Sequence, residues 1–243
     1  MSTTTVILLL LFAFGASFVQ RVTGFGFGIF IMTILPFLMP SYAEATALSG
    51  LLALISATVT AAQTFRHLDW KKLWIILPVF LAVSFFCIKA VAQIDSHTLR
   101  RVLGGVLILV SIYFFFVSGR IHIKPSAPAQ ISMGCVSGVM GGFFAMQGPP
   151  AVIYFLSCAD SKDQYMSLIS TYFVISNSMM TLFRASNGFV TPTVGKAWLF
   201  ALPATALGIW LGTKVYRRMP IQILRKTVYA YMAVAGVIAI ICG

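Results

Sequence analysis

The chain has 243 residues, of which 59% are hydrophobic and 9% charged, and its mean hydropathy is +0.95. This composition excludes a soluble domain, because several windows of ~20 mostly apolar residues are each long enough to cross ~30 Å of hydrocarbon. The net charge of +12 would suggest nucleic acid as the partner of a soluble chain. Here the basic residues lie mostly in short loops, where they report orientation and contact lipid headgroups, so no nucleic-acid partner is expected.

The sequence predicts an all-α polytopic membrane protein that forms one transmembrane domain over residues 1–243. Eight apolar segments cover roughly residues 5–38, 43–64, 73–91, 99–118, 129–158, 165–184, 197–214 and 222–242. Helix-start signals support several of them. Ser41 with Glu44, and Ser161 with Gln164, fit the capping box, and Thr191 precedes a proline at the first helical position.

The first apolar segment is interrupted by the sequence Gly24-Phe25-Gly26-Phe27-Gly28, which Thr23 precedes. Each glycine weakens a helix by about 1 kcal/mol relative to alanine. Lipid cannot satisfy the backbone N–H and C=O groups that a broken helix exposes. Either a matching protein segment or a polar substrate must therefore meet this break.

The fifth segment contains a second break, whose expected ligand-contacting residues are Gly141, Gly142, Gln147, Gly148 and Pro149. Half-helix N-termini offer free N–H groups and a partial positive charge, which suit a small oxyanion. Gln147 can add an amide donor. The alternative interpretation is that these glycines allow helices to pack closely, as small residues do in membranes. The aromatic residues beside the breaks either exclude water from the site or serve packing alone.

Arg21 is a charge deep in an apolar segment, and we expect it near the tip of the first break, where it would face the anion. Snorkelling to the surface or pairing with a carbonyl is the alternative. Glu44 is either a helix cap or a proton site. No His, Cys, Asp and Glu spacing fits a metal site, and no nucleophile–base or carboxylate pair fits catalysis. The sequence therefore predicts no enzyme and no cofactor.

The two halves of the chain, residues 1–120 and 127–243, match each other. Gly24, Gly28 and Pro36 pair with Gly138, Gly142 and Pro150 at a shift of 114, and the shift grows to 120 and 125 further along. If each broken segment is a re-entrant hairpin, the loop Lys and Arg residues divide eleven to five between the two sides; if each spans once, they divide nine to seven. The stronger bias favours hairpins. We therefore expect inverted repeats, six further crossings and both termini on the non-cytoplasmic side.

These motifs resemble those of the TauE/SafE family of sulfite exporters. The family pattern places a T/S-G-x-G-x-G stretch before a proline, here Thr23–Gly28 with Pro36, and one subgroup continues its second glycine-rich stretch as M-Q-G-P-P, here Met146–Pro150. Asp69-Trp70 also looks like the family, and the resemblance covers essentially the whole chain. It implies export of sulfur oxyanions or organosulfonates across the bacterial inner membrane.

Together these observations predict a secondary transporter in which a small anion binds between two broken helices. An anion channel with the same breaks, and a membrane scaffold without transport, remain alternatives. The sequence leaves the choice of anion, the coupling ion and the oligomeric state open, a homodimer included.

Overall fold

The computed structural model describes residues 2–113 and 126–216, and this part of the chain is almost entirely helical and contains no β-strand. The helices are α1 (Thr3–Thr23), α2 (Phe27–Ile31), α3 (Leu35–Leu38), α4 (Tyr42–Thr64), η1 (Phe65–His67), η2 (Trp70–Lys72), α5 (Ile76–Val91), α6 (Ser96–Ile112), α7 (Ala127–Phe144), α8 (Gly148–Cys158), α9 (Lys162–Ser186) and α10 (Pro192–Tyr216). The last predicted segment, 222–242, lies outside the described residues.

Four of the described helices are long and apolar enough to cross a membrane. They are α1, α4 with its η1 extension, α9 and α10. These helices therefore agree with the multi-pass membrane protein that the composition predicts.

The capping residues that the sequence indicates begin the long helices. The Ser41 hydroxyl accepts the N–H of Glu44 at 3.1 Å, and Ser161 accepts that of Gln164 at 3.1 Å. Asp95 caps α6 in the same way and accepts the N–H of Thr98 at 2.8 Å. Each cap satisfies one of the N–H groups that a helix start leaves without a partner.

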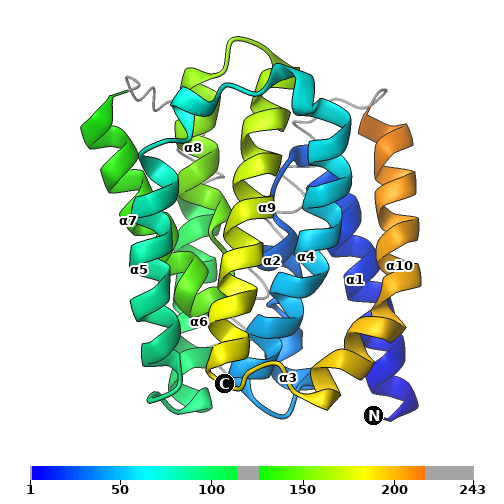
Figure 1. Ribbon diagram of the computed structural model, residues 1–243. Coiled ribbons are helices and arrows are strands. Elements are labelled where there is room, and N and C mark those ends of the chain that lie inside the picture. The colour runs from blue at the N-terminus through cyan, green and yellow to red at the C-terminus, as the bar shows by residue number, and fades with distance from the viewer. Residues whose placement is uncertain (1, 114–125, 217–243) are drawn as a thin grey trace.

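The first break lies between α1 and α2. Gly24 ends α1 in the left-handed conformation, with φ of 84°, and Gly26 follows with φ of 96°. Positive φ values favour glycine, because a Cβ atom on any other residue would cause steric strain in this conformation. In Figure 1, α1 rises from the lower end of the bundle, where the N-terminus lies, and α2 and α3 return to that end. We call the lower end the N-terminal face.

The second break lies between α7 and α8, and this pair enters from the other end. Figure 1 shows α7 descending from the upper end and α8 returning to it, where η1 and η2 also lie. Ala145 turns the chain with φ of 55°, and its N–H bonds the Gly141 carbonyl at 3.0 Å. The two broken segments thus approach each other from opposite ends of the molecule.

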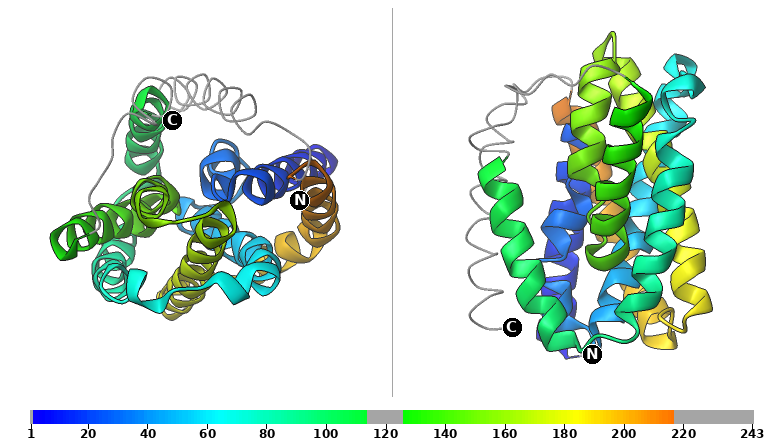
Figure 2. Two further views of the ribbon diagram at one scale, coloured as in Figure 1. Left: turned by 90° about the horizontal axis from the view of Figure 1, so that it is seen from above. Right: turned by 90° about the vertical axis from the view of Figure 1, so that its left-hand side faces the viewer.

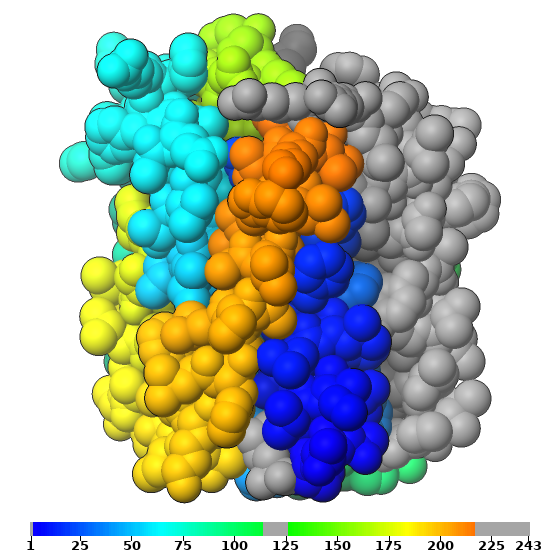
Figure 3. All heavy atoms as spheres, turned by 90° about the vertical axis from the view of Figure 1, so that its right-hand side faces the viewer, coloured from blue at the N-terminus to red at the C-terminus, as the bar shows by residue number. Residues whose placement is uncertain are grey.

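Three helix pairs make up most of the packing: α1 with α10, α5 with α7, and α4 with α9. Seen from above in Figure 2, α1 and α10 lie at one end of the bundle, α5 and α7 at the other, and α4 and α9 between them. Figure 3 shows α1 and α10 side by side along the height of one face.

Glycines allow the two helices to pack closely in two of these pairs. A Cβ on Gly138 of α7 would come within 2.7 Å of Val83 on α5, and one on Gly212 of α10 would come within 2.8 Å of Arg21 on α1. Gly138 and Gly142 therefore lie inside a helix, although the sequence match pairs them with Gly24 and Gly28 of the first break. The two helix ends, Thr23 and Phe144, are 121 residues apart rather than 114. The glycines of the two halves therefore serve different purposes, because Gly24 ends a helix whereas Gly138 and Gly142 lie within one.

Candidate functional site

The two breaks touch each other in the middle of the bundle. A Cβ on Gly28 would overlap the carbonyl oxygen of Ala145, and one on Gly148 would lie 3.5 Å from the Cβ of Phe25. Glycine at 28 is therefore required for this approach, because any side chain would push the two segments apart. The exposed backbone of one break is covered by the other break.

A small cavity lies where the breaks meet. It has room for about one water molecule. The first break, the second break and the two central helices all line it, through Gln20, Gly26, Phe27, Gly28, Ile29, Ala53, Ala145, Met146, Gln147, Gly148, Phe173 and Asn177. None of these residues is charged.

Three carboxamides give the cavity its polar character. The Gln147 amide donates to the Asn177 side-chain oxygen at 3.0 Å, and the Gln20 side-chain oxygen is buried with no hydrogen-bond partner. A carboxamide can turn to present either its oxygen or its NH₂ group. The site can therefore bind a ligand through amide donors as well as through backbone N–H groups.

A buried network fixes the second break from behind. The Ser137 hydroxyl donates to the Gln147 carbonyl at 2.5 Å and lies 2.7 Å from the Tyr172 hydroxyl. It ties α7 and α9 to the turn that carries Gln147. These side-chain hydrogen bonds therefore fix the position of the turn in addition to its backbone connections to α7 and α8.

The predicted site residues divide into those that reach the cavity and those that shape its surroundings. Gly26, Phe27, Gly28, Gln147 and Gly148 line it. The other seven predicted residues do not line the cavity: Thr23, Gly24, Phe25, Gly141, Gly142, Pro149 and Arg21.

Thr23, Gly24 and Phe25 form the turn itself. The Thr23 hydroxyl lies 2.9 Å from the Val19 carbonyl oxygen and 2.7 Å from that of Phe25, so it donates within the turn. A Cβ on Gly24 would meet the Met166 sulfur of α9 at 2.9 Å. These residues set the path of the chain before it reaches the cavity.

Gly141, Gly142 and Pro149 also have packing roles. A Cβ on Gly142 would overlap Cys87 of α5, and one on Gly141 would lie 2.9 Å from the Phe80 ring. Pro149 follows Gly148 in the first turn of α8, where a missing N–H is tolerated. For Gly142, close helix packing is the interpretation that the geometry supports.

Arg21 points away from the cavity. Its Nε donates to the Thr213 hydroxyl of α10 at 2.8 Å, its Nη2 donates to the Gln63 side chain of α4, and its guanidinium lies 5.5 Å from the Tyr216 ring centre. Gln20 faces the cavity, and successive helix residues point about 100° apart. The neighbouring Arg21 is therefore directed between α4 and α10.

Glu44 takes part in capping. Its N–H is bound by Ser41, and one carboxylate oxygen accepts the Thr191 hydroxyl at 2.6 Å. It thereby joins the start of α4 to the segment before α10. These contacts account for a buried carboxylate without proton transfer.

Sequence reasoning missed Gln20 of α1 and two residues of α9, Asn177 and Arg184. Asn177 lies inside an apolar segment, and an intramembrane amide is a signal that could have identified it. Arg184 is the last residue of the predicted segment 165–184, but α9 runs on to Ser186 and buries it completely. The length of a helix beyond its apolar stretch is not fixed by hydropathy.

Comparison with known proteins now adds to this geometry. The family model described as sulfite exporter TauE/SafE matches residues 9–238. The chain belongs to the TauE/SafE sulfite exporter family. It is also 24% identical, over 84% of its length and 80% of the relative's, to a protein of Cupriavidus necator named probable sulfite/organosulfonate exporter TauE. No solved structure matches the chain significantly.

Membership identifies the molecule as a membrane transporter and not an enzyme. The apolar helices place this TauE/SafE protein in a membrane as a multi-pass protein. The family also accounts for the broken helices, since transporters tolerate irregular backbone where it lines a site within the membrane.

Proposed function

We propose that this protein exports a small sulfur-containing oxyanion, sulfite or an organosulfonate, across the bacterial inner membrane through the cavity between the two breaks. The observation that carries the proposal is the meeting of Gly26–Gly28 with Ala145–Gly148 around a polar cavity inside a bundle of apolar helices. Family membership and the name of the Cupriavidus relative support the substrate class.

The chemistry of the cavity favours an anion over a cation. No acidic side chain is among the residues that line it. The first helical bond of α2 runs from the Phe30 N–H to the Gly26 carbonyl at 2.9 Å, so the N–H groups of Phe27, Gly28 and Ile29 have no carbonyl partner within this helix. The side-chain NH₂ group of Asn177 adds donors beside them. Together these groups can replace the water that a small oxyanion loses.

An inverted repeat would give this site two routes of access. The pairs α1–α10 and α5–α7 each join a helix of the first half to a helix of the second. If α1 corresponds to α7 and α5 to α10, the repeat relates these two pairs, and α4 and α9 correspond to each other across the centre. The hairpins enter from opposite ends. Rocking of one repeat against the other would then open the cavity to each face in turn.

The membrane potential is the proposed driving force. Glu44 is the buried carboxylate of the described residues, and it is bound as a cap. One negative charge moving out of a cell with a negative interior gains about 2.3 kcal/mol per 100 mV. Export of an anion thus needs no proton-carrying residue in this part of the chain.

Flux into or out of proteoliposomes tests the proposal directly. Wild-type protein should carry sulfite or sulfoacetate in a saturable manner. Ala53→Leu puts a larger side chain into the cavity wall and should reduce flux at least tenfold, whereas Ala62→Leu, on the exposed side of the same helix, should leave it unchanged. Equal flux in the two variants would show that transport does not pass through this cavity.

The choice between carrier and channel needs a second measurement. A carrier should show counterflow, in which anion on the far side accelerates uptake, and a channel should not. Thermal-shift titrations with sulfite, sulfate, thiosulfate, sulfoacetate and chloride would rank the ligands. Absence of a shift with every sulfur anion would contradict the proposed substrate class.

A further inference from the structure

Arg184 is a buried charge that neither the packing nor the cavity lining explains. It lies in the last turn of α9 with no exposed surface. Its Nη2 donates to the Gly141 carbonyl at 2.8 Å, while Nε and Nη1 have no hydrogen-bond partner. Burying charged donors without partners is costly, so a residue kept there calls for a further role.

No acidic side chain neutralises this guanidinium within the described residues. The ion pair found there joins Lys72 to Asp160 near η2, far along the chain from Arg184. Glu44 is bound by Ser41 and Thr191 instead. In the part of the chain that the structure describes, Arg184 therefore remains a buried positive charge without a counter-charge.

Arg184 is two helical turns beyond Asn177 on α9, and its guanidinium lies beside Gly50 on α4. On α9, Asn177, Thr181 and Arg184 are spaced by four and three residues and so share one face. On α4, a Cβ on Gly50 would lie 3.0 Å from Nη1 of Arg184, and Ala53, three residues further on, lines the cavity. A stripe of polar groups thus leads from the cavity along the α4–α9 seam toward the N-terminal face.

The neighbours of Arg184 are hydroxyls. The Thr181 hydroxyl lies 3.6 Å from the same Cβ position on Gly50, and Tyr42 is fully buried at the start of α4, eight residues before Gly50. Both hydroxyl oxygens are buried without hydrogen-bond partners. Hydroxyl donors beside a guanidinium match the needs of an oxyanion.

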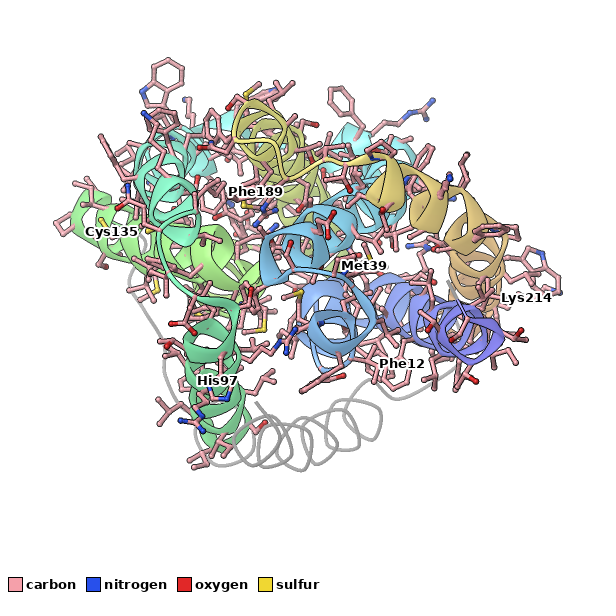
Figure 4. The ribbon with its side chains drawn as sticks, turned by 90° about the horizontal axis from the view of Figure 1, so that it is seen from below. Phe12, Met39, His97, Cys135, Phe189 and Lys214 are labelled. Atoms are coloured by element: carbon pink, nitrogen blue, oxygen red, sulfur yellow. The ribbon has the colours of Figure 1, made fainter. Side chains whose placement is uncertain are left out.

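The face toward which this stripe leads carries buried apolar side chains in its central part. Met39, between α3 and α4, and Phe189, after α9, are labelled toward the middle of the view from below in Figure 4, whereas His97 lies nearer its edge. Met39 and Phe189 are buried. The Phe189 N–H also bonds the Arg184 carbonyl at 2.9 Å, which couples the two residues.

We infer that Arg184 forms a second anion-binding point on the α4–α9 seam, between the central cavity and the N-terminal face, together with the hydroxyls of Thr181 and Tyr42. This inference rests on the proposed function, because it assigns a step in the path of the same anion. The guanidinium supplies the positive charge that the cavity lining lacks. Its bond to Gly141 also links the second break to α9, so an anion bound here would be sensed at the tip of that break.

The test is sulfite transport by full-length protein in proteoliposomes, with the KM and the anion-free melting temperature measured for each variant. Arg184→Met should raise the KM for sulfite roughly tenfold, the effect of losing a charged hydrogen bond. Gly50→Ala should shift the guanidinium and raise the KM about threefold. Lys196→Gln, an exposed charge near the same face, should change neither quantity.

A purely structural role for Arg184 would lower the melting temperature and leave the KM unchanged, which would overturn the inference. If Arg184→Met does not fold, Gly50→Ala, Tyr42→Phe and Thr181→Ala decide the matter, since each leaves the buried charge in place. Wild-type KM in all three would equally overturn it. Absence of sulfite flux in wild-type protein would instead refute the proposed function, so the two failures are distinguishable.

Discussion

Gly28 is the residue on which the contact between the two breaks depends. A methyl group at this position would overlap a backbone oxygen, that of Ala145, which cannot rotate away as a side chain can. We therefore predict that Gly28→Ala abolishes transport and lowers the stability of the protein by about 1–3 kcal/mol, the usual cost of overpacking. Flux assays and thermal unfolding of the purified protein measure the two effects.

Gly195→Ala is the matched control for this prediction. A Cβ on Gly195, in α10, would meet no atom within 4 Å. Alanine there should stabilise the helix by up to about 1 kcal/mol and leave transport unchanged. Wild-type flux in Gly28→Ala would mean that the two breaks need not touch.

Arg21 is predicted to act through packing and not through the anion. Arg21→Met removes the bonds to Thr213 and Gln63, and we expect a loss of about 1.5–3 kcal/mol in stability with a sulfite KM within threefold of wild type. Thermal unfolding and flux kinetics separate these outcomes. A tenfold rise in KM at an unchanged melting temperature would contradict this prediction. It would show that Arg21 takes part in anion binding, as the sequence predicts from its position near the first break.

At the scale of elements, the glycines of α7 set the distance between α7 and α5. We predict that Gly142→Ala destabilises the protein by about 1–3 kcal/mol, because its Cβ would overlap that of Cys87. Cys87→Gly removes the opposing Cβ and should restore part of this loss in the double variant. Additive effects in this double-mutant cycle, measured by thermal unfolding, would contradict direct contact at this point.

Helix positions followed closely from sequence, whereas the use of individual residues within them did not. Apolar length and capping residues placed α4 and α9 within a few residues, because a cap acts locally on its own helix. The roles of Gly138 and Gly142 depended on α5, which lies far away in sequence. Composition alone does not distinguish a glycine that breaks a helix from one that packs against a neighbour.

At the scale of the whole molecule, orientation in the membrane is the outstanding prediction. The sequence predicts that the face carrying Lys71 is cytoplasmic and the N-terminal face is not, although much of the charge bias rests on residues 114–125 and 217–243, outside the described part. In a background without native cysteines, His97→Cys should react with an impermeant maleimide in intact cells. Lys71→Cys should react only after permeabilisation. The reverse pattern would invert the orientation.

The sequence by itself determined that this is a helical membrane transporter, where its two helices break and which caps start its helices, since hydropathy, glycine content and capping are properties of short stretches of chain. The tertiary structure alone decided that Gly28 meets Ala145, that Gln20 and Asn177 face the cavity while Arg21 turns away, and that Arg184 is buried on the α4–α9 seam. These facts depend on which helices become neighbours and on how each is rotated about its axis. A rotation of about 100° separates adjacent residues, so it decides whether a charge faces the substrate path or a packing seam.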